Sequence, residues 1–349
     1  MNQRRTVGSD MPSVEHSNAV GDQALPWQTD EPIVYAETGR QILRHLSDGL
    51  WKMGRRELVL PDFLCESMIL PFSGHAWKIS TVSVDADYVM QPRSLVQRAK
   101  ATREPFVVLT AAYFGRQPDA ELVSAVGQVQ EAGGFVIDDE THRILDPLPI
   151  GADVAIASLR KLLPLADGAY LRGWSGFPSS GMLPPRELRR WQAMDDKRAE
   201  TKASEEIYAG FVRGNEELEA ELELRSISNR SRLELSSLDY KMMALTRCAN
   251  AEILSLLLAG IEEVQIVNIP DSRSIPSHLL VRSPDPSALQ KHLAAAGIFC
   301  PIHWPATDLL HRKAMWPKLS VSMPIDHRYD ARDMHNMAHA LKEYFSHVG

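Results

Sequence analysis

The sequence predicts an α/β fold in which a mostly parallel β-sheet is sandwiched by helices, followed by a smaller C-terminal α+β domain. From Glu31 onward, short β-rich runs alternate with longer segments of helical period, which is the pattern of a parallel sheet covered by helices. The 349 residues are 44% hydrophobic and 24% charged, so the chain has enough apolar material to form a core. At about 150 residues per domain, this length favours two domains.

The first half of the chain contains candidate helices and strands in alternation. Two helices are indicated by apolar residues that recur on one face. These residues are Ile42, Leu43, Leu46 and Leu50 in the first helix and Leu122, Val123, Val126 and Val129 in the second. Central strands are expected at Glu57–Leu60, Lys78–Val84, Phe106–Ala111, Phe135–Asp138, Val154–Ala157 and Ala169–Leu171.

The composition changes after Pro184. Residues 187–223 are rich in Glu, Arg, Lys and Ala and should be mostly helical, and Arg232–Leu258 reads as one long amphipathic helix. The remaining segments predict strands at Val264–Val267, His278–Val281 and Leu319–Met323 and helices at Pro286–Ala295 and Ala331–His347. We therefore expect a loose tail over residues 1–28, a large domain over 29–240, and a small domain over 241–349 joined by the long helix.

Composition also excludes several classes of partner. The 38 basic and 45 acidic residues give a net charge of −7 without long runs of one sign, so neither nucleic acid nor an anionic membrane surface is expected. No stretch approaches the ~20 apolar residues that cross a bilayer, and Met1–Gln28 lacks the apolar centre of a secretory signal. The three cysteines are widely spaced, and the histidines show no metal-ligand spacing, so we expect a cytoplasmic protein without a metal site.

One candidate strand delivers two carboxylates at its end. The run Phe135–Asp139 is apolar until Asp138 and Asp139, and ligands of open α/β sheets bind at the carboxyl ends of the strands. A buried carboxylate needs a cationic partner, and a protonated ring nitrogen would serve. A strand-end turn in which an aspartate caps a helix explains the same residues.

A lysine follows the next candidate strand. Lys161 lies in the run Ser158-Leu159-Arg160-Lys161, directly after Val154–Ala157. An amine there would suit reaction with an aldehyde, because desolvation and the neighbouring Arg160 would both lower its pKa from ~10.4. Alone, Lys161 would be an ordinary surface lysine; its position 22 residues after Asp139 favours a site.

These runs resemble the pyridoxal-phosphate (PLP) enzymes of the aspartate-aminotransferase fold, fold type I, and among them the DegT/StrS-like sugar aminotransferases. The similarity extends from about Glu31 to the C-terminus. The matching segments are Tyr35–Arg40, Leu58–Cys65, Val136–Asp139 and Ser158–Lys161. The aspartate strand and the lysine loop together are the specific part of the resemblance.

The resemblance implies a role for each matching residue. Lys161 would bond covalently to the cofactor aldehyde and shuttle the proton, Asp139 would hold the proton on the pyridine nitrogen, and His142 would contact the phenolic oxygen. The phosphate would bind at the start of the first helix through Thr38, Gly39 and Arg40, with Ser158 adding a hydroxyl. A structural histidine and an ordinary helix cap are the alternatives for His142 and Thr38.

The sequence departs from the family at the cofactor ring. Members place an aromatic residue near the position of Cys65 and often a histidine at that of Ala112. Phe63, Cys65 and Tyr113 are therefore our candidates for packing on the ring.

Three more residues are candidates through the resemblance. His303 and Arg328 in the small domain would contact substrate, Arg328 by gripping a carboxylate. Members are homodimers with shared active sites, and Asn229 in Ser228–Ser231 is the candidate contact to the partner's phosphate. A Pro-flanked loop, a surface Asp–Arg pair, and a polar turn with Ser231 as helix cap explain the same segments.

The sequence therefore predicts a PLP-dependent aminotransferase that moves an amino group from an amino acid to a keto acceptor by a ping-pong route. The acceptor is either a nucleotide-linked keto sugar or a smaller keto compound. Two alternatives stay open: a PLP enzyme of elimination or replacement, and a non-catalytic regulatory protein that keeps the fold.

Overall fold

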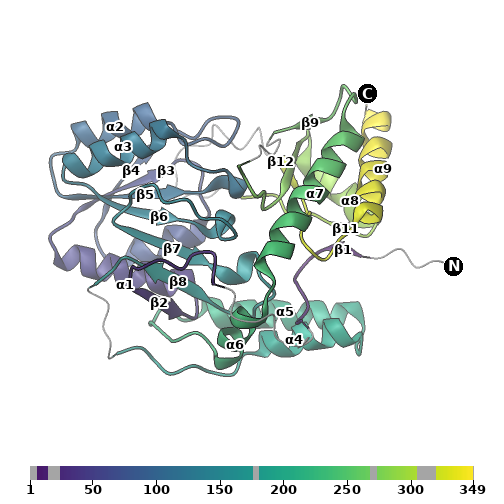
Figure 1. Ribbon diagram of the computed structural model, residues 1–349, viewed down its shortest axis with the longest axis horizontal. Coiled ribbons are helices and arrows are strands. Elements are labelled where there is room, and N and C mark those ends of the chain that lie inside the picture. The colour runs from purple at the N-terminus through teal and green to yellow at the C-terminus, as the bar shows by residue number, and fades with distance from the viewer. Residues whose placement is uncertain (1–5, 15–23, 176–180, 268–272, 305–319, 349) are drawn as a thin grey trace.

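The computed structural model of the chain describes residues 6–14, 24–175, 181–267, 273–304 and 320–348. Figure 1 shows a large domain built on one sheet and a small domain beside it. The predicted α/β class is confirmed, because the large sheet is mostly parallel and has helices on both faces.

The large sheet has seven strands in the order β2-β8-β7-β6-β5-β3-β4. The bounds are β2 Ile33–Ala36, β3 Glu57–Pro61, β4 Lys78–Val82, β5 Phe106–Ala111, β6 Phe135–Asp139, β7 Val154–Ser158 and β8 Ala169–Arg172. All six expected strands form, but the expectation of a central position is wrong for β4, which lies at an edge, and β2 was not expected. β8 runs antiparallel to both of its neighbours, β7 and β2. The strands from β4 to β7 are parallel, so their carboxyl ends meet at one edge.

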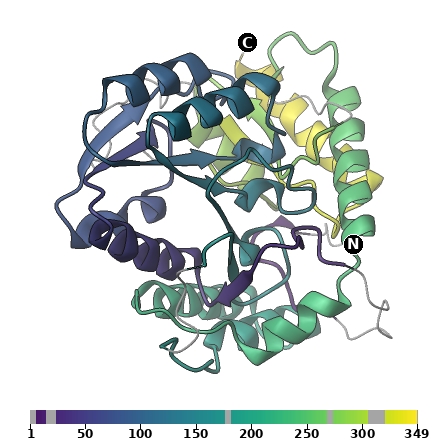
Figure 2. The same cartoon turned by 60° about the vertical axis from the view of Figure 1, so that its left-hand side comes forward.

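Helices cover the two faces of this sheet (Figures 1 and 2): α1 (Gly39–Lys52) lies on one face, and α2 (Pro92–Ala101) and α3 (Ala120–Glu131) lie on the other. All four predicted core residues of α1 are buried. In α3 the prediction is wrong for Val123, which is 41% exposed; Ala125 is buried instead, one turn from Val129. Successive residues of β3 alternate between the two cores, as a two-residue period requires.

Four helices follow the large sheet: α4 (Arg189–Ala199), α5 (Ser204–Glu219), α6 (Asn229–Ser237) and α7 (Tyr240–Leu258). The single long helix expected over 232–258 is wrong, because the chain breaks at Leu238 and Asp239. Leu238 is extended and buried, and the Asp239 carboxylate accepts the N–H of Met242 at 2.9 Å and starts a new helix. The first turns of α7 belong to a core of the large domain and its later turns to the small-domain core, so both domains share this helix.

The small domain packs helices on a three-stranded antiparallel sheet of order β12-β10-β9. Its elements are β9 Gln265–Ile266, β10 Leu279–Arg282, α8 Pro286–Ala295, β11 Ile298–Phe299, β12 Ser320–Met323 and α9 Ala331–Val348. The expected strands and helices of this domain are present, and their ends agree to within one residue; residue 319 lies outside the described residues.

The N-terminal segment is partly built into the fold, so the expectation of a loose tail is wrong for residues 6–14. β1 (Val7–Gly8) pairs in parallel with β11 of the small domain, and Ser13 donates its N–H to the carbonyl of Met194 on α4. Trp27 is fully buried and stacks on Tyr170. Among the described helices, none is both long and apolar enough to span a membrane.

Candidate active site

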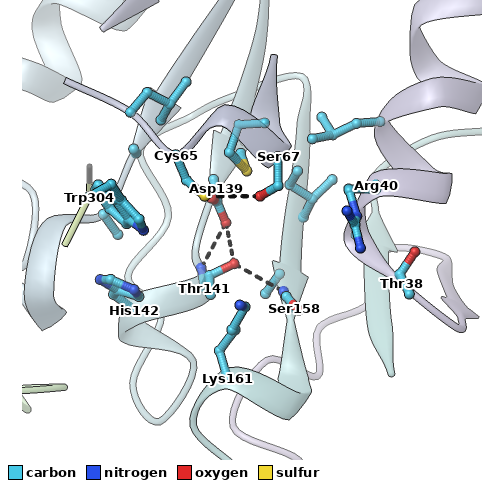
Figure 3. Close-up of a pocket in the computed structure, with 18 of the residues that line it drawn as sticks. Thr38, Arg40, Cys65, Ser67, Asp139, Thr141, His142, Ser158, Lys161 and Trp304 are labelled. Atoms are coloured by element: carbon cyan, nitrogen blue, oxygen red, sulfur yellow. Dashed lines mark hydrogen bonds between the residues drawn. The ribbon is translucent and has the colours of Figure 1, made fainter. Parts of the chain in front are cut away.

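Asp139 and Lys161 come from neighbouring strands and face the same cavity. Asp139 is the last residue of β6, in register with Ile156 of β7. β7 ends at Ser158 and leads directly into the 3-10 turn Leu159–Lys161. Figure 3 shows the Lys161 amine pointing up toward Thr141 and Asp139. Because parallel strands end at the same edge, two residues that are 22 positions apart in the sequence line one cavity.

The cavity has a volume of about 240 Å³ and lies between the strand ends, the start of α1 and the small-domain loop that carries His303. It is lined by ten of the predicted site residues: Thr38, Gly39, Arg40, Cys65, Tyr113, Asp139, His142, Ser158, Lys161 and His303. Arg160, Glu219, Thr141, Ser67 and Trp304 also line it and were not among those predicted.

The Lys161 amine loses its proton more readily than a free lysine does. Its side chain is exposed to the cavity, with Arg160 beside it in the sequence. The positive charge of Arg160, followed by desolvation, lowers the pKa of Lys161 to about 8. A lower pKa leaves more of the amine unprotonated and nucleophilic than in a free lysine.

Asp139 is buried, and Thr141 holds its carboxylate. Thr141 donates its N–H, at 2.9 Å, and its hydroxyl to the same oxygen, Oδ1, so neither bond uses Oδ2. Burial raises the pKa of Asp139 to about 6, and the hydrogen bonds from Thr141 oppose that rise. The Thr141 hydroxyl also accepts the N–H of Ser158 at 3.0 Å, so it joins the ends of β6 and β7 (Figure 3).

The end of the cavity at the start of α1 is suited to an anion. Thr38 caps α1, as predicted, because its hydroxyl accepts the N–H of Gln41 at 3.3 Å. The next residue, Gly39, lies close to Ser158: a Cβ built on Gly39 would be 3.8 Å from the Cβ of Ser158. The positive end of the helix dipole therefore lies against Ser158. We call Arg40, Arg160 and this helix start the anion end of the cavity.

One arginine of the anion end, Arg160, has a buried donor without a partner. Arg40 pairs with Glu219 at 3.4 Å, while the buried Nε of Arg160 has no hydrogen-bond partner. Burial, with Arg190 and Arg40 nearby, lowers the pKa of Arg160 to about 10, which still leaves it charged at neutral pH. An unpaired buried donor on a cation is costly unless a ligand meets it. A phosphate group would meet it.

The remaining side of the cavity is aromatic. The Nδ1 atom of His142 accepts the N–H of Phe114 at 3.2 Å, and burial lowers the pKa of His142 to about 3. The imidazole is therefore neutral, and its proton is on Nε2. Trp304 stacks on His142 with ring centroids 5.7 Å apart. Burial also lowers the pKa of His303 to about 4, so this wall has neutral imidazoles.

The fold also brings His278 to this wall. Its ring lies 4.9 Å from that of His303 and 6.1 Å from that of His142. Among the described residues, no group of three His, Cys, Asp or Glu side chains is arranged to hold a metal ion.

The residues proposed to pack on the cofactor ring have different environments. Tyr113 lines the cavity, and its hydroxyl donates a hydrogen bond to the carbonyl of Phe63. Phe63 itself is not among the residues that line the cavity. Cys65 lines it with its sulfur 3.1 Å from the Ser67 hydroxyl. Trp304 was missed, although it stands beside the predicted His303 in a Pro-flanked run.

The structure does not bring Asn229 or Arg328 into the cavity. Arg328 donates two hydrogen bonds to Asp326, at 2.6 and 2.8 Å. Its geometry is therefore that of an Asp–Arg pair, which was the alternative to a substrate contact. Asn229 is exposed at the start of α6. The cap of that helix is Ser228 and not Ser231 as expected, because Ser228 accepts the N–H of Ser231 at 3.2 Å.

The comparisons with known proteins rest on structure alone. No family model matches the sequence, and no curated protein matches it significantly. A putative sugar aminotransferase of Streptococcus pneumoniae in its PLP form is similar with a TM-score of 0.70 and 14% identity, over 99% of this chain and 100% of that chain. A DegT/DnrJ/EryC1/StrS aminotransferase of Brucella abortus is similar with a TM-score of 0.61 and 15% identity, over 89% and 85%.

The chain has the aminotransferase fold. This finding confirms the fold that the sequence resemblance implied. The aminotransferase fold is shared by a NifS-like protein of Rickettsia africae, with a TM-score of 0.60 and 15% identity over 90% of this chain and 82% of that chain. Fold alone therefore leaves the reaction open, and the site must decide it.

Proposed function

We propose that this chain is a PLP-dependent aminotransferase that moves an amino group from an amino acid donor to a keto acceptor. The observation that carries the proposal is the placement of Lys161 and Asp139 at one cavity that also contains the anion end. The side chains fit the cofactor group by group: an amine for its aldehyde, a carboxylate for its ring nitrogen, and arginines at a helix start for its phosphate.

Each residue then has a defined task. When bound, the cofactor supplies an aldehyde that reacts with amines and a ring that takes up electrons while a proton moves. The Lys161 amine takes the proton from the substrate carbon and returns it. Asp139 holds a proton at the ring nitrogen, using the carboxylate that Thr141 fixes. His142 donates its Nε2 proton to the phenolic oxygen, because its Nδ1 is engaged by Phe114.

The acceptor we propose is a keto sugar, and the route is ping-pong. Support comes from the similarity of the fold to that of sugar aminotransferases. Elimination or replacement on an amino acid would use the same amine and carboxylate, so the reaction with an amino donor must separate the two functions.

We further propose a homodimer in the cytoplasm. Leu233, Met242 and Leu245 are 69%, 44% and 62% exposed on α6 and the start of α7, as an apolar subunit contact would require. The three cysteines are free thiols, which suits a reducing compartment. Light scattering of the purified protein measures the mass; a monomer at all concentrations would contradict the dimer.

The visible spectrum of purified protein incubated with PLP tests the proposal. We expect an absorbance band that borohydride fixes covalently on Lys161, identified by peptide mass spectrometry. Added glutamate or another amino donor should then bleach the band as the amino group passes to the cofactor. Cofactor binding without bleaching by any donor would favour elimination or replacement, and absence of binding would favour a non-catalytic protein.

A further inference from the structure

Residues 6–14 form a segment that connects the small domain with the large domain, and we call it the N-terminal strap. In Figure 1 it passes from β1, beside β11, down to α4. At the small domain, Val7 donates to the carbonyl of Gly297 at 3.0 Å, and Gly8 donates to the Tyr329 hydroxyl at 2.7 Å. At the large domain, Lys197 of α4 donates to the carbonyl of Asp10 at 2.6 Å. Both ends of the strap are therefore anchored.

The sequence of the strap fixes its path. Gly8 has φ +89°, and a Cβ there would lie 1.9 Å from the carbonyl oxygen of Phe299. Only glycine fits this close approach. Ser9, which follows, also has a left-handed backbone, with φ 63°. The turn made by these two residues directs Asp10 away from β11 and toward α4.

Asp10 reaches the back of the anion end through two side chains. Its carboxylate accepts a hydrogen bond from Nη2 of Arg190 at 2.7 Å. Nη1 of Arg190 donates to Oδ1 of Asn215 at 2.8 Å, and Nη1 of Arg160 donates to the same oxygen at 3.4 Å. Arg160 lines the cavity, so the chain of contacts runs from the strap to the cavity wall.

The arrangement places two guanidinium groups at one amide oxygen. Arg190 is only 4% exposed, so little solvent screens its charge. Arg40 adds a third cation, paired with Glu219, and the carboxylate that offsets Arg190 is Asp10. Arg160 and Arg190 both lower the pKa of Lys161. A change in the net positive charge around these arginines therefore changes the pKa of the reactive amine.

We propose that Asp10 sets the positive charge of the anion end: by neutralising Arg190 it moderates the affinity of the cavity for a phosphate group. That the anion is a phosphate rests on the proposed function. The strap is thus part of the binding machinery, although it lies outside the cavity, and Asp10 is a positioning and charge-setting residue.

The test compares Asp10→Asn with wild type on cofactor-free protein. The first measurement is the affinity for inorganic phosphate by calorimetry, and the second is the midpoint pH of Lys161 labelling by an amine-reactive reagent, followed by mass spectrometry. We expect phosphate to bind about threefold to tenfold more tightly and the Lys161 midpoint to move to lower pH, because one compensating charge is lost. The affinity for PLP should rise in parallel if the cofactor phosphate occupies this end.

The sign of the effect separates this role from a structural one. General damage to the strap would release Arg190, weaken phosphate binding and raise the Lys161 midpoint. Either that result or no change would overturn the proposal. Glu252→Gln, which removes the same charge from an exposed position on α7, is the matched control and should change neither measurement.

Two further variants keep the test independent of folding and of the proposed function. Asp10→Glu should restore wild-type values, and Arg190→Gln combined with Asp10→Asn should cancel most of the shift, since both charges are then absent. If wild type binds no PLP, the proposed function fails, yet the phosphate and labelling measurements still decide the role of Asp10.

Discussion

Thr141 donates both its backbone N–H and its hydroxyl to one oxygen of Asp139, and the same hydroxyl accepts the N–H of Ser158. One small side chain thus fixes the carboxylate at the end of β6 and ties it to the strand that leads to Lys161. The relative position of the amine and the carboxylate depends on this link.

Thr141→Val should therefore alter the acid–base behaviour of the site. The hydroxyl lowers the pKa of Asp139 against the effect of burial, so its loss raises that pKa further above about 6. The acid limb of the rate profile should move to higher pH, and the free energy of unfolding should fall by about 1–3 kcal/mol because Ser158 loses its acceptor. Thr141→Ser keeps the hydroxyl and should retain the wild-type profile; equal profiles for Val and wild type would contradict this role.

Asp139→Asn should stabilise the cofactor-free protein while it destroys activity. The pKa of Asp139 is about 6 in the folded chain against 3.8 ordinarily, so between these pH values the folded state retains a proton that the unfolded state has released. Stability therefore falls as pH rises through this interval, and above pH 6 the cost of the buried charge is fully present, on the order of 3 kcal/mol.

Urea unfolding at pH 4 and pH 7.5 checks this prediction. Asn keeps an oxygen for Thr141 and carries no charge, so the variant should exceed wild type in stability at pH 7.5 and lose that advantage at pH 4. Its turnover should fall by ~10²-fold or more, because an amide cannot hold the ring proton. Near-normal turnover would remove Asp139 from the proposed role.

Lys161→Ala should lose turnover by ~10²–10⁴-fold, the contribution expected of a positioned general acid and base. The variant should also lose the borohydride-stable label while it still binds phosphate at the anion end, since Arg40 and Arg160 remain. Lys52→Ala, on the exposed end of α1, is a control for loss of a lysine. A label that persists on another lysine would contradict the assignment.

His142→Phe should lower turnover by ~10–100-fold. This factor corresponds to the loss of one hydrogen bond to a charged group, which contributes about 1.5–3 kcal/mol. The shape of the rate profile between pH 5 and 8 should not change, because burial holds the pKa of His142 at about 3 and the ring stays neutral in this range. A profile that loses a step near pH 6.5 in the variant would show that the histidine titrates.

Gly8→Ala should destabilise the chain more than Gly54→Ala. Both glycines have positive φ, +89° and +86°, so both variants carry the backbone strain of about 1 kcal/mol or more. Only Gly8 faces a carbonyl oxygen at 1.9 Å, whereas Gly54 has open space around it. Equal losses in urea unfolding would show that the strap is not docked on β11.

Local patterns in the sequence were sufficient for most of the fold. Strand runs such as Phe106–Ala111 and the amphipathic face of α1 follow from side-chain period, which neighbouring residues determine. The break before Asp239 was missed, because a buried Leu238 fits the helical period as well as it fits an extended turn.

The sequence by itself determined the layered architecture and the two strand ends that carry Asp139 and Lys161, since strand period and the chemistry of a strand end are local properties. Tertiary structure alone decided which side chains meet across long separations. It turned Arg328 toward Asp326, gathered His278 and His303 beside His142, and anchored Asp10 on Arg190, 180 residues away. Such contacts depend on how separate helices and strands pack against one another, which the local periodicity of the sequence does not determine.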